Sequence, residues 1–148
     1  MIGYYNDEDK KIMKVSAQAR NKSRLQELID FVKISGYRKI GVANCKGVQD
    51  LADRFIELLR GQGFEVMAIN CKESGLNGCD ICDEMKGPCC DPVSQAAFLN
   101  RQQTDFNINF GLCLGHGLLF QKYSNAPVTT FLVKDFVHNH DVTEYLCE

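Results

Sequence analysis

Hydrophobic and polar positions follow two different periods along this chain. Short apolar runs, typical of buried strands, occupy residues 39–44, 64–70, 107–113 and 127–133. Between these runs, apolar residues recur three and four positions apart, a spacing that gives a helix one hydrophobic face. Helices are therefore predicted over residues 7–21, 23–36, 48–60, 93–103 and 118–124.

Strands that alternate with helices predict an α/β fold, because a helical crossover brings the next strand back parallel to the last. We expect a small three-layer, Rossmann-like domain with about four mainly parallel strands and helices on both faces. This single cysteine-rich domain should extend over residues 1–148, with residues 1–36 as its helical N-terminal part. Ser23 and Gln26 form a predicted capping box, and Gly36 should end the helix that follows them.

Residues 72–92 follow neither period and are predicted to form an irregular loop. They include glycines, prolines and four of the eight cysteines, namely Cys79, Cys82, Cys89 and Cys90. A loop of about 20 residues in a compact domain usually has a function or is disordered. The cysteines in this loop favour a function.

Composition and charge narrow the class of protein. A chain with 45% hydrophobic and 24% charged residues is typical of a soluble globular protein, and its net charge of −2 argues against a surface for nucleic acid or anionic membranes. No apolar run approaches the roughly 18 residues that a membrane span needs. The acidic N-terminus has no apolar signal-peptide core. We therefore expect a cytoplasmic protein whose cysteines are metal ligands or reactive thiols rather than disulfides.

Three of the predicted strands end at or just before a cysteine: Cys45, Cys71 and Cys113. In an open α/β sheet, ligands bind at the edge formed by the carboxyl ends of the strands. One such cysteine could simply be a small buried apolar side chain. Three independent core cysteines, however, have no reason to share one edge. Their joint position favours a metal site or a reactive-thiol site.

The loop cysteines add a recognisable metal-ligand spacing. Two thiolates spaced as in Cys79-x-x-Cys82 can bind one metal ion, and a further cysteine pair follows them. We expect Cys79 and Cys82 either to bind a metal together with Cys89 or to cover the first site. Ligation by thiolates alone suits zinc and iron–sulfur clusters equally, so both are candidate cofactors.

His116, between Gly115 and Gly117, is the candidate acid–base residue. The flanking glycines predict a tight turn that presents the imidazole at the cysteine edge. We expect His116 to orient or protonate a small molecule bound at the metal, with Asp135 from the next strand end as its partner. The alternative is that His116 only stabilises the turn.

A second function class stays open, namely a thiol enzyme for sulfur transfer or redox exchange. A helix that begins just after Cys45 or Cys113 would favour a reactive thiolate, and so would a protonated His116. The chain has no Cys-x-x-Cys that opens a helix directly after a strand, which counts against a thioredoxin-like mechanism.

Several motifs occur in a fixed order along the chain. They are Cys-Asp-Pro-Val-Ser-Gln-Ala at residues 90–96, Gly-Leu-Cys-Leu-Gly-His at 111–116, Ala-Pro-Val-Thr at 126–129 and Val-Lys-Asp at 133–135, together with the strand ends at Cys45 and Cys71. From Arg38 to the C-terminus, the chain thus resembles the uncharacterised family called domain of unknown function 1847, whose members are described as predicted metal-binding proteins.

This resemblance implies a cytoplasmic α/β protein that holds a metal through cysteines and has no established reaction. The positions that match the characteristic cysteines of the family are Cys45, Cys71, Cys90 and Cys113. We therefore expect these four sulfurs to converge on one centre at the carboxyl edge of the sheet. A zinc ion there would lie about 2.3 Å from each sulfur.

Overall fold

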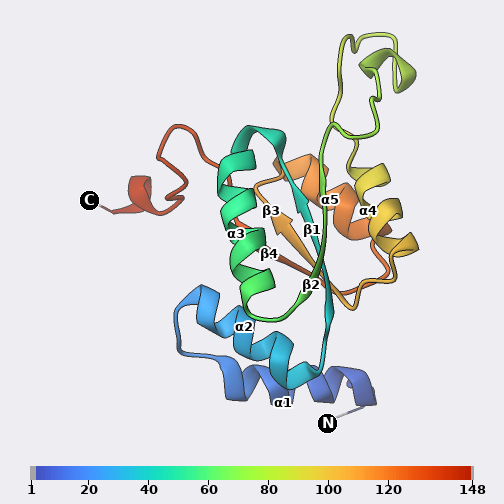
Figure 1. Ribbon diagram of the computed structural model, residues 1–148. Helices are drawn as coiled ribbons and strands as arrows, with labels where there is room; N and C mark the ends of the chain where they lie inside the picture. The colour runs from blue at the N-terminus through green and yellow to red at the C-terminus, as the bar shows by residue number, and fades with distance from the viewer. Residues whose placement is uncertain (1–2, 148) are drawn as a thin grey trace. The chain divides into compact units, whose positions relative to one another are not determined.

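The computed structural model describes residues 3–147 and divides into two compact units, one up to Arg38 and one from Lys39 onward (Figure 1). In chain order the helices and strands are α1 (Asp7–Ala19), α2 (Arg24–Ser35), β1 (Lys39–Asn44), α3 (Gln49–Gly61), β2 (Glu65–Asn70), α4 (Pro92–Arg101), β3 (Phe106–Phe110), α5 (Leu114–Tyr123) and β4 (Val128–Leu132). Short 3₁₀ helices occupy Lys46–Val48, Gly78–Asp80 and Glu144–Leu146. Within residues 3–147, no helix is both long enough and apolar enough to cross a membrane.

The first unit consists of α1 and α2, and a side chain caps the start of each helix. The side chain of Asn6 accepts a hydrogen bond from the Asp9 amide, and the Asp9 carboxylate accepts one from the Asn6 amide, at 2.8 and 3.1 Å. Ser23 Oγ accepts from the Gln26 amide at 3.1 Å, so Ser23 caps α2 as predicted. Among the described residues, the reciprocal bond of a capping box is not formed, because the Gln26 side chain donates to Asp30 instead. Gly36 ends α2 with φ 78°, a left-handed conformation that glycine adopts without strain.

The second unit is built on one four-stranded sheet in which all neighbouring strands are parallel, in the order β2-β1-β3-β4. Val42 of β1 lies opposite Ala68 of β2 on one side and Ile108 of β3 on the other. The α/β class predicted from the sequence is confirmed. Because every strand runs in the same direction, the segments that follow all four strands begin at one edge of the sheet.

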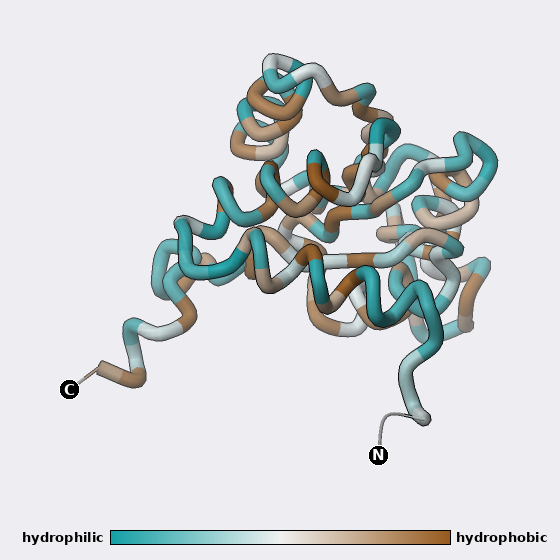
Figure 2. The backbone as a smooth tube through the Cα atoms, turned by 90° about the horizontal axis from the view of Figure 1, so that it is seen from below, coloured by the Kyte–Doolittle hydropathy of each residue, from teal (hydrophilic) through white to brown (hydrophobic). Residues whose placement is uncertain are grey.

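Helices cover both faces of this sheet, which gives three layers. On one face, Phe55 of α3 stacks on Phe110 and Phe131, with ring centroids 4.9 and 4.5 Å apart. On the other face, α4 and α5 pack against each other and bury Leu99 and Phe120 completely. Along the helical stretches of Figure 2, hydrophobic residues in brown alternate with hydrophilic residues in teal, as expected for helices with one buried face.

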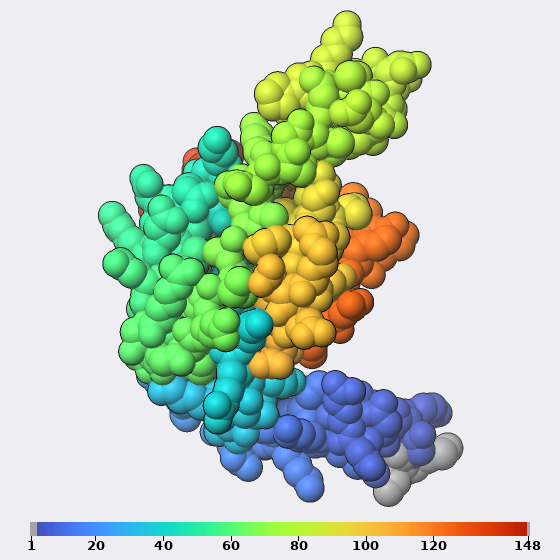
Figure 3. Space-filling view, turned by 45° about the vertical axis from the view of Figure 1, so that its right-hand side comes forward, coloured from blue at the N-terminus to red at the C-terminus, as the bar shows by residue number. Residues whose placement is uncertain are grey.

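The predicted irregular loop between β2 and α4 has more regular structure than the sequence indicated. Asn77 and Pro88 form an antiparallel bridge, and the Gly78 amide donates to the Gly87 carbonyl at 2.8 Å. At the base of the loop, the Asp91 amide donates to the carbonyl of Cys71 at 2.7 Å. Figures 1 and 3 show this segment in yellow-green, projecting beyond the sheet and its helices. The two ends of the loop are thus held together while its tip extends away.

The prediction of a tight turn at residues 115–117 is wrong, because α5 begins at Leu114 and includes these residues. The chain turns instead at Gly111, whose φ is 76°. Gly117 allows close packing and does not form a turn, since a Cβ atom at this position would lie only 2.8 Å from Asn109 Nδ2. Glycine is needed there for close packing of α5 on β3, and the prediction mistook this packing glycine for a turn. As a result, His116 lies in the first turn of a helix.

Asp91, at the start of α4, should stabilise the protein only above acidic pH. Its carboxylate accepts hydrogen bonds from the Ser94 amide at 3.0 Å and from the hydroxyls of Ser74 and Ser94, each at 2.6 Å. Partial burial alone would raise the pKa of Asp91, but these hydrogen bonds outweigh it and hold the pKa below its usual value. A lowered folded-state pKa adds stability above the unfolded value of about 3.9, and that stability is lost as the pH falls through the folded value.

We therefore expect Asp91→Ala to lower the free energy of unfolding by about 1 kcal/mol at pH 7 and to differ little from the parent at the acid end of the range. Urea unfolding at a series of pH values measures this difference. Asp83→Ala, which removes an exposed carboxylate from the same loop, is the control. If the loss of unfolding free energy in Asp91→Ala stays constant down to acid pH, the ionised Asp91 carboxylate is not the source of this stability.

Candidate cysteine centre

Backbone hydrogen bonds hold the carboxyl ends of β1, β3 and β4 side by side. The Cys45 amide donates to the Phe110 carbonyl at 3.2 Å, and the Gly111 amide donates to the Leu132 carbonyl at 2.9 Å. The chain passes from β1 to β2 on one side and returns to β3 on the other, so the strand order reverses between β1 and β3. In open α/β sheets, the crevice at such a reversal is where ligands bind. Cys45 and Cys113 follow the two strands that flank it.

The ammonium group of Lys134 lies between these two cysteines. Lys134 Nζ donates to Cys45 Sγ at 3.2 Å and to Cys113 Sγ at 3.1 Å. Partial burial alone would lower the pKa of Lys134, but the hydrogen bonds to the Cys113 and Cys45 sulfurs outweigh it, and this pKa lies above its usual value. Lys134 therefore stays charged at neutral pH and links the segments that follow β1, β3 and β4.

Cys71 and Cys90 form a second pair, with their sulfurs 3.4 Å apart. Cys71, after β2, is 2% exposed, and its sulfur also accepts from the Lys46 amide at 3.4 Å. Partial burial, then the hydrogen bond to Cys71, raises the pKa of Cys90 to about 11. Cys90 is consequently a protonated thiol at neutral pH and donates to the sulfur of Cys71.

The turn after β1 connects the two pairs. The Gly47 amide donates to Cys45 Sγ at 3.3 Å, while the neighbouring Lys46 amide donates to Cys71 Sγ. Cys45, Cys71 and Cys90 also belong to one packed cluster on the α4 side of the sheet. N–H donors directed at sulfur stabilise a thiolate more than a thiol. The turn after β1 thus supplies one backbone N–H donor to a sulfur of each pair.

The donor set suits a metal, although it is arranged as two pairs. A tetrahedral ion bound at about 2.3 Å separates its sulfur ligands by about 3.8 Å, close to the 3.4 Å between Cys71 and Cys90. Cys45 and Cys113 are instead both bonded to the Lys134 ammonium. In the described part of the chain, no three cysteine, histidine, aspartate or glutamate side chains converge as a group able to hold a metal ion. The structure brings the four predicted cysteines to one edge without assembling one tetrahedral group.

Mild oxidation of the metal-free protein should join Cys71 to Cys90 in preference to other pairs. A disulfide bond of about 2.05 Å needs only a short movement from their present contact. Each bond formed transfers two electrons and two protons to glutathione disulfide, which leaves as two glutathione molecules. Peptide mapping after equilibration with glutathione disulfide measures the product. A map dominated by Cys79–Cys82, or the same map from a Cys90→Ser protein, would contradict this expectation.

The other candidate ligands lie outside these two pairs. Cys79 is exposed and Cys82 is partly buried, both within the projecting loop. Cys89 Sγ donates to the Cys90 carbonyl at 3.3 Å. Within residues 3–147, Cys79, Cys82 and Cys89 do not form a three-ligand group. Their role as loop ligands stays a prediction, and Cys147 is exposed near the C-terminus.

Within residues 3–147, Asp135 hydrogen-bonds to His138 and its neighbours, and no hydrogen bond joins it to His116. Asp135 accepts from the His138 ring nitrogen Nδ1 at 3.2 Å and from the amides of Val137 and His138. The backbone bond from His138 is the largest reason that the pKa of Asp135 lies below its usual value. Partial burial, then the charge of Lys134, lowers the pKa of His116, so this imidazole is neutral at pH 7. Their roles at a bound ligand stay predictions.

The sequence interpretation missed three residues that shape this edge. Lys134 was placed at a strand end but given no role. Asn109 Oδ1 accepts from the Leu112 amide at 3.1 Å and so fixes the turn that leads to Cys113. The buried Gln95 donates from Nε2 to the carbonyls of Asn44 and Ile69, at 3.2 and 2.9 Å, and joins the ends of β1 and β2. The rule that selected the cysteines, position at the carboxyl edge, would also have selected Lys134.

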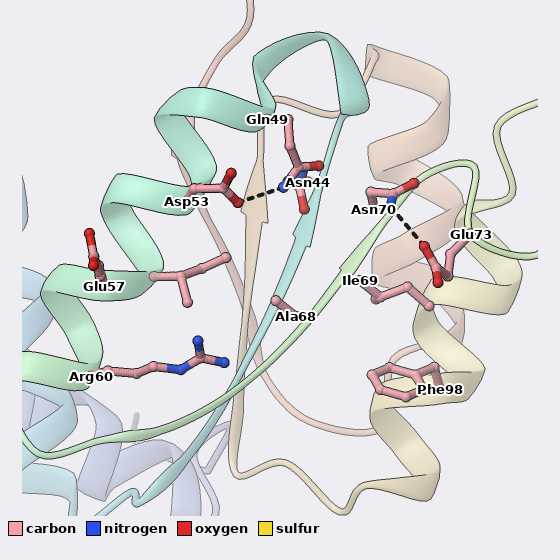
Figure 4. Close-up of a pocket in the computed structure, with 11 residues that line it drawn as sticks. Asn44, Gln49, Asp53, Glu57, Arg60, Ala68, Ile69, Asn70, Glu73 and Phe98 are labelled. Carbon is pink, nitrogen blue, oxygen red and sulfur yellow. Dashed lines mark hydrogen bonds between the residues drawn. The ribbon is translucent and has the colours of Figure 1, made fainter.

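A cavity of about 620 Å³ lies beside β2 and is flanked by α3 and α4 (Figure 4). Its walls include Asn44 and Asn70, the last residues of β1 and β2, but none of the cysteines. Many of its polar groups bond one another: Gln49 donates to Asp53 at 2.8 Å and Asn70 donates to Glu73 at 2.9 Å. The two cysteine pairs therefore lie outside this cavity.

Comparison with known proteins supports the resemblance inferred from the motifs. The family model described as a protein of unknown function (DUF1847) matches residues 1–131, so the similarity includes the N-terminal helices as well as the strands. The uncharacterized protein MJ0455 of Methanocaldococcus jannaschii is 42% identical over 148 residues, a match that covers 93% of this chain and 76% of the archaeal protein. No solved structure matches the chain. The chain therefore belongs to the DUF1847 family.

Proposed function

We propose that this protein binds zinc or an iron–sulfur cluster through Cys45, Cys71, Cys90 and Cys113. The observation that carries the proposal is the gathering of four thiols from four separate segments at one sheet edge, two of them in contact at 3.4 Å. Backbone amides already donate to Cys45 and Cys71. Such donors stabilise thiolate ligands and orient them. In the cytoplasm, where we place the protein, these thiols would stay reduced.

Binding would require Cys113 and Cys45 to move toward Cys71 and Cys90, or the reverse. The segment carrying Cys113 begins at Gly111 and is joined to its neighbours by few backbone bonds, whereas Cys71 is buried at the base of the loop. A shift at the start of α5 is therefore the route that we propose to a shared centre. At such a centre, His116 would orient or protonate a molecule bound to the metal rather than bind the metal itself, with Asp135 as its partner.

Elemental analysis of protein purified without oxygen, together with its ultraviolet–visible spectrum, tests this proposal. We expect about one zinc ion or one cluster for each chain, and one equivalent of Co²⁺ should give sulfur-to-cobalt absorption bands in the metal-free protein. Binding should weaken at lower pH, because thiol protons must leave as the metal binds. Protein that contains no metal and takes up neither zinc, cobalt nor iron with sulfide would refute it.

A second candidate function is thiol chemistry without a metal, and one observation favours it. The ammonium of Lys134 contacts the sulfurs of both Cys45 and the exposed Cys113. A positive charge at this distance makes a cysteine more nucleophilic at neutral pH. In that case, iodoacetamide should modify Cys113 much faster than Cys147, which is also exposed, in metal-free protein. Equal rates for the two cysteines would count against this function.

A further inference from the structure

We infer that Lys134 is the positioning residue of the cysteine centre, holding Cys45 and Cys113 together and offsetting the negative charge of the bound thiolates. The inference rests on the proposed function, because it assigns a role at the same metal site. No other lysine or arginine hydrogen bond to sulfur is formed among residues 3–147.

The fold brings Lys134 to this position from a distant part of the chain. Lys134 follows β4, the edge strand, whereas Cys45 follows β1 two strands away. The turn at Gly111 lies between them, and a Cβ atom there would be 3.6 Å from Lys134 Cβ and 2.8 Å from Val48 Cγ2. A larger residue at this position would push the two segments apart. The glycine therefore permits the close approach that lets one side chain reach both sulfurs.

Charge explains why a cation is useful at this point. A divalent ion bound by four thiolates carries a net charge of about −2, which the protein must stabilise at a partly buried site. The backbone amides of Lys46 and Gly47 offer only partial positive charges to Cys71 and Cys45. Cys113 receives no such amide bond within residues 3–147, and its sulfur bonds Lys134 alone. Lys134 thus supplies the full positive charge where the backbone supplies the least.

Replacing Lys134 by methionine keeps the apolar stem and removes the charge and its N–H donors. We expect Lys134→Met to bind Co²⁺ about 10–100-fold more weakly than the parent in competition with a chelator, the usual loss when a partner of a metal ligand is removed. Lys134→Arg should recover most of the affinity, because it restores the charge and the donors. Lys122→Met, which removes an exposed lysine from α5, is the matched control and should bind as the parent does. Circular dichroism melting establishes that each variant is folded.

The outcomes separate this inference from the proposed function. If Lys134→Met binds as tightly as the parent, or more tightly, the inference is wrong while metal binding stands. If the parent binds no metal, the proposed function fails, and alkylation still tests the position of Lys134. In metal-free protein, Lys134→Met should then slow iodoacetamide modification of Cys45 and Cys113 relative to the parent and leave Cys147 unchanged. If each of the three cysteines is modified at the same rate in Lys134→Met as in the parent, the inferred role of Lys134 is wrong, and this result needs no metal.

Discussion

A Cys71→Ser protein should lose metal binding, whereas a Cys147→Ser protein should keep it. Cys71 is the most buried of the four proposed ligands, and its sulfur contacts Cys90 and the Lys46 amide. Removing only a partner of a ligand commonly costs 10–100-fold in metal affinity, so removing the ligand itself should cost more than about 100-fold. Cobalt titration followed by sulfur-to-cobalt absorption measures the loss.

Two further variants make this result specific to the centre. Cys113→Ser should reduce affinity to a similar degree, because its sulfur is the proposed ligand from the β3 side. Cys79→Ser, in the projecting loop, should reduce metal affinity at the sheet edge much less. If Cys71→Ser and Cys113→Ser both retain parental affinity while Cys79→Ser loses it, the metal site lies in the loop and the sheet edge is not the centre.

Gly41→Ala should be the most destabilising single methyl addition in the sheet. A Cβ atom at Gly41 would lie 2.2 Å from Asn107 Oδ1 and 2.8 Å from Leu99 Cδ1. Neither neighbour can move easily, because Leu99 is fully buried and Asn107 Oδ1 accepts from the Thr104 hydroxyl at 2.6 Å. Overpacking of this kind costs about 1–3 kcal/mol and occasionally more, and we expect the upper part of that range.

Gly61→Ala is the matched control for this substitution. Gly61 ends α3, and no atom lies within 4 Å of the position a Cβ would take. Alanine should therefore raise the free energy of unfolding there, by about 0.5–1 kcal/mol. Urea unfolding of both proteins, with the slope compared as well as the midpoint, provides the measurement. A Gly41→Ala protein as stable as the parent would mean that β1 and α4 are less closely packed than the structure indicates.

Periodicity was sufficient to predict the strands but not every helix. The strand at 39–44 has the predicted bounds, and the other three differ at their ends by a few residues. These runs are apolar because both faces of the sheet are covered, and such burial leaves a clear pattern. The predicted start of α5 is too late, because Gly115 and Gly117 favour a turn on sequence grounds while the helix begins at Leu114. Nothing in a single sequence distinguishes a glycine needed for packing from one needed for a turn.

The site was predicted in outline for a similar reason. Parallel strands place their carboxyl ends at one edge, so Cys45, Cys71 and Cys113 could be assigned to that edge from strand positions alone. How the thiols pair depends on side-chain directions and on the path of the loop, which no local pattern encodes. The contact between Cys71 and Cys90 exists because the base of the loop is closed by the Asp91 amide. Lys134 was missed because lysine at a strand end is usually solvated.

The position of Lys134 also determines when the cysteine edge is completed as the chain leaves the ribosome. Lys134 and Cys45 are 89 positions apart, so Cys45 has long been synthesised before its ammonium partner emerges. Cys71, Cys90 and Cys113 also precede Lys134 in the chain, so all four proposed ligands are synthesised before it. Because β4 is the last strand in chain order, the contact with Lys134 can form only once the residues of the other three strands have been synthesised. If the edge binds metal as we propose, a chain that has not yet added its final strand lacks the positive charge that we infer for the centre.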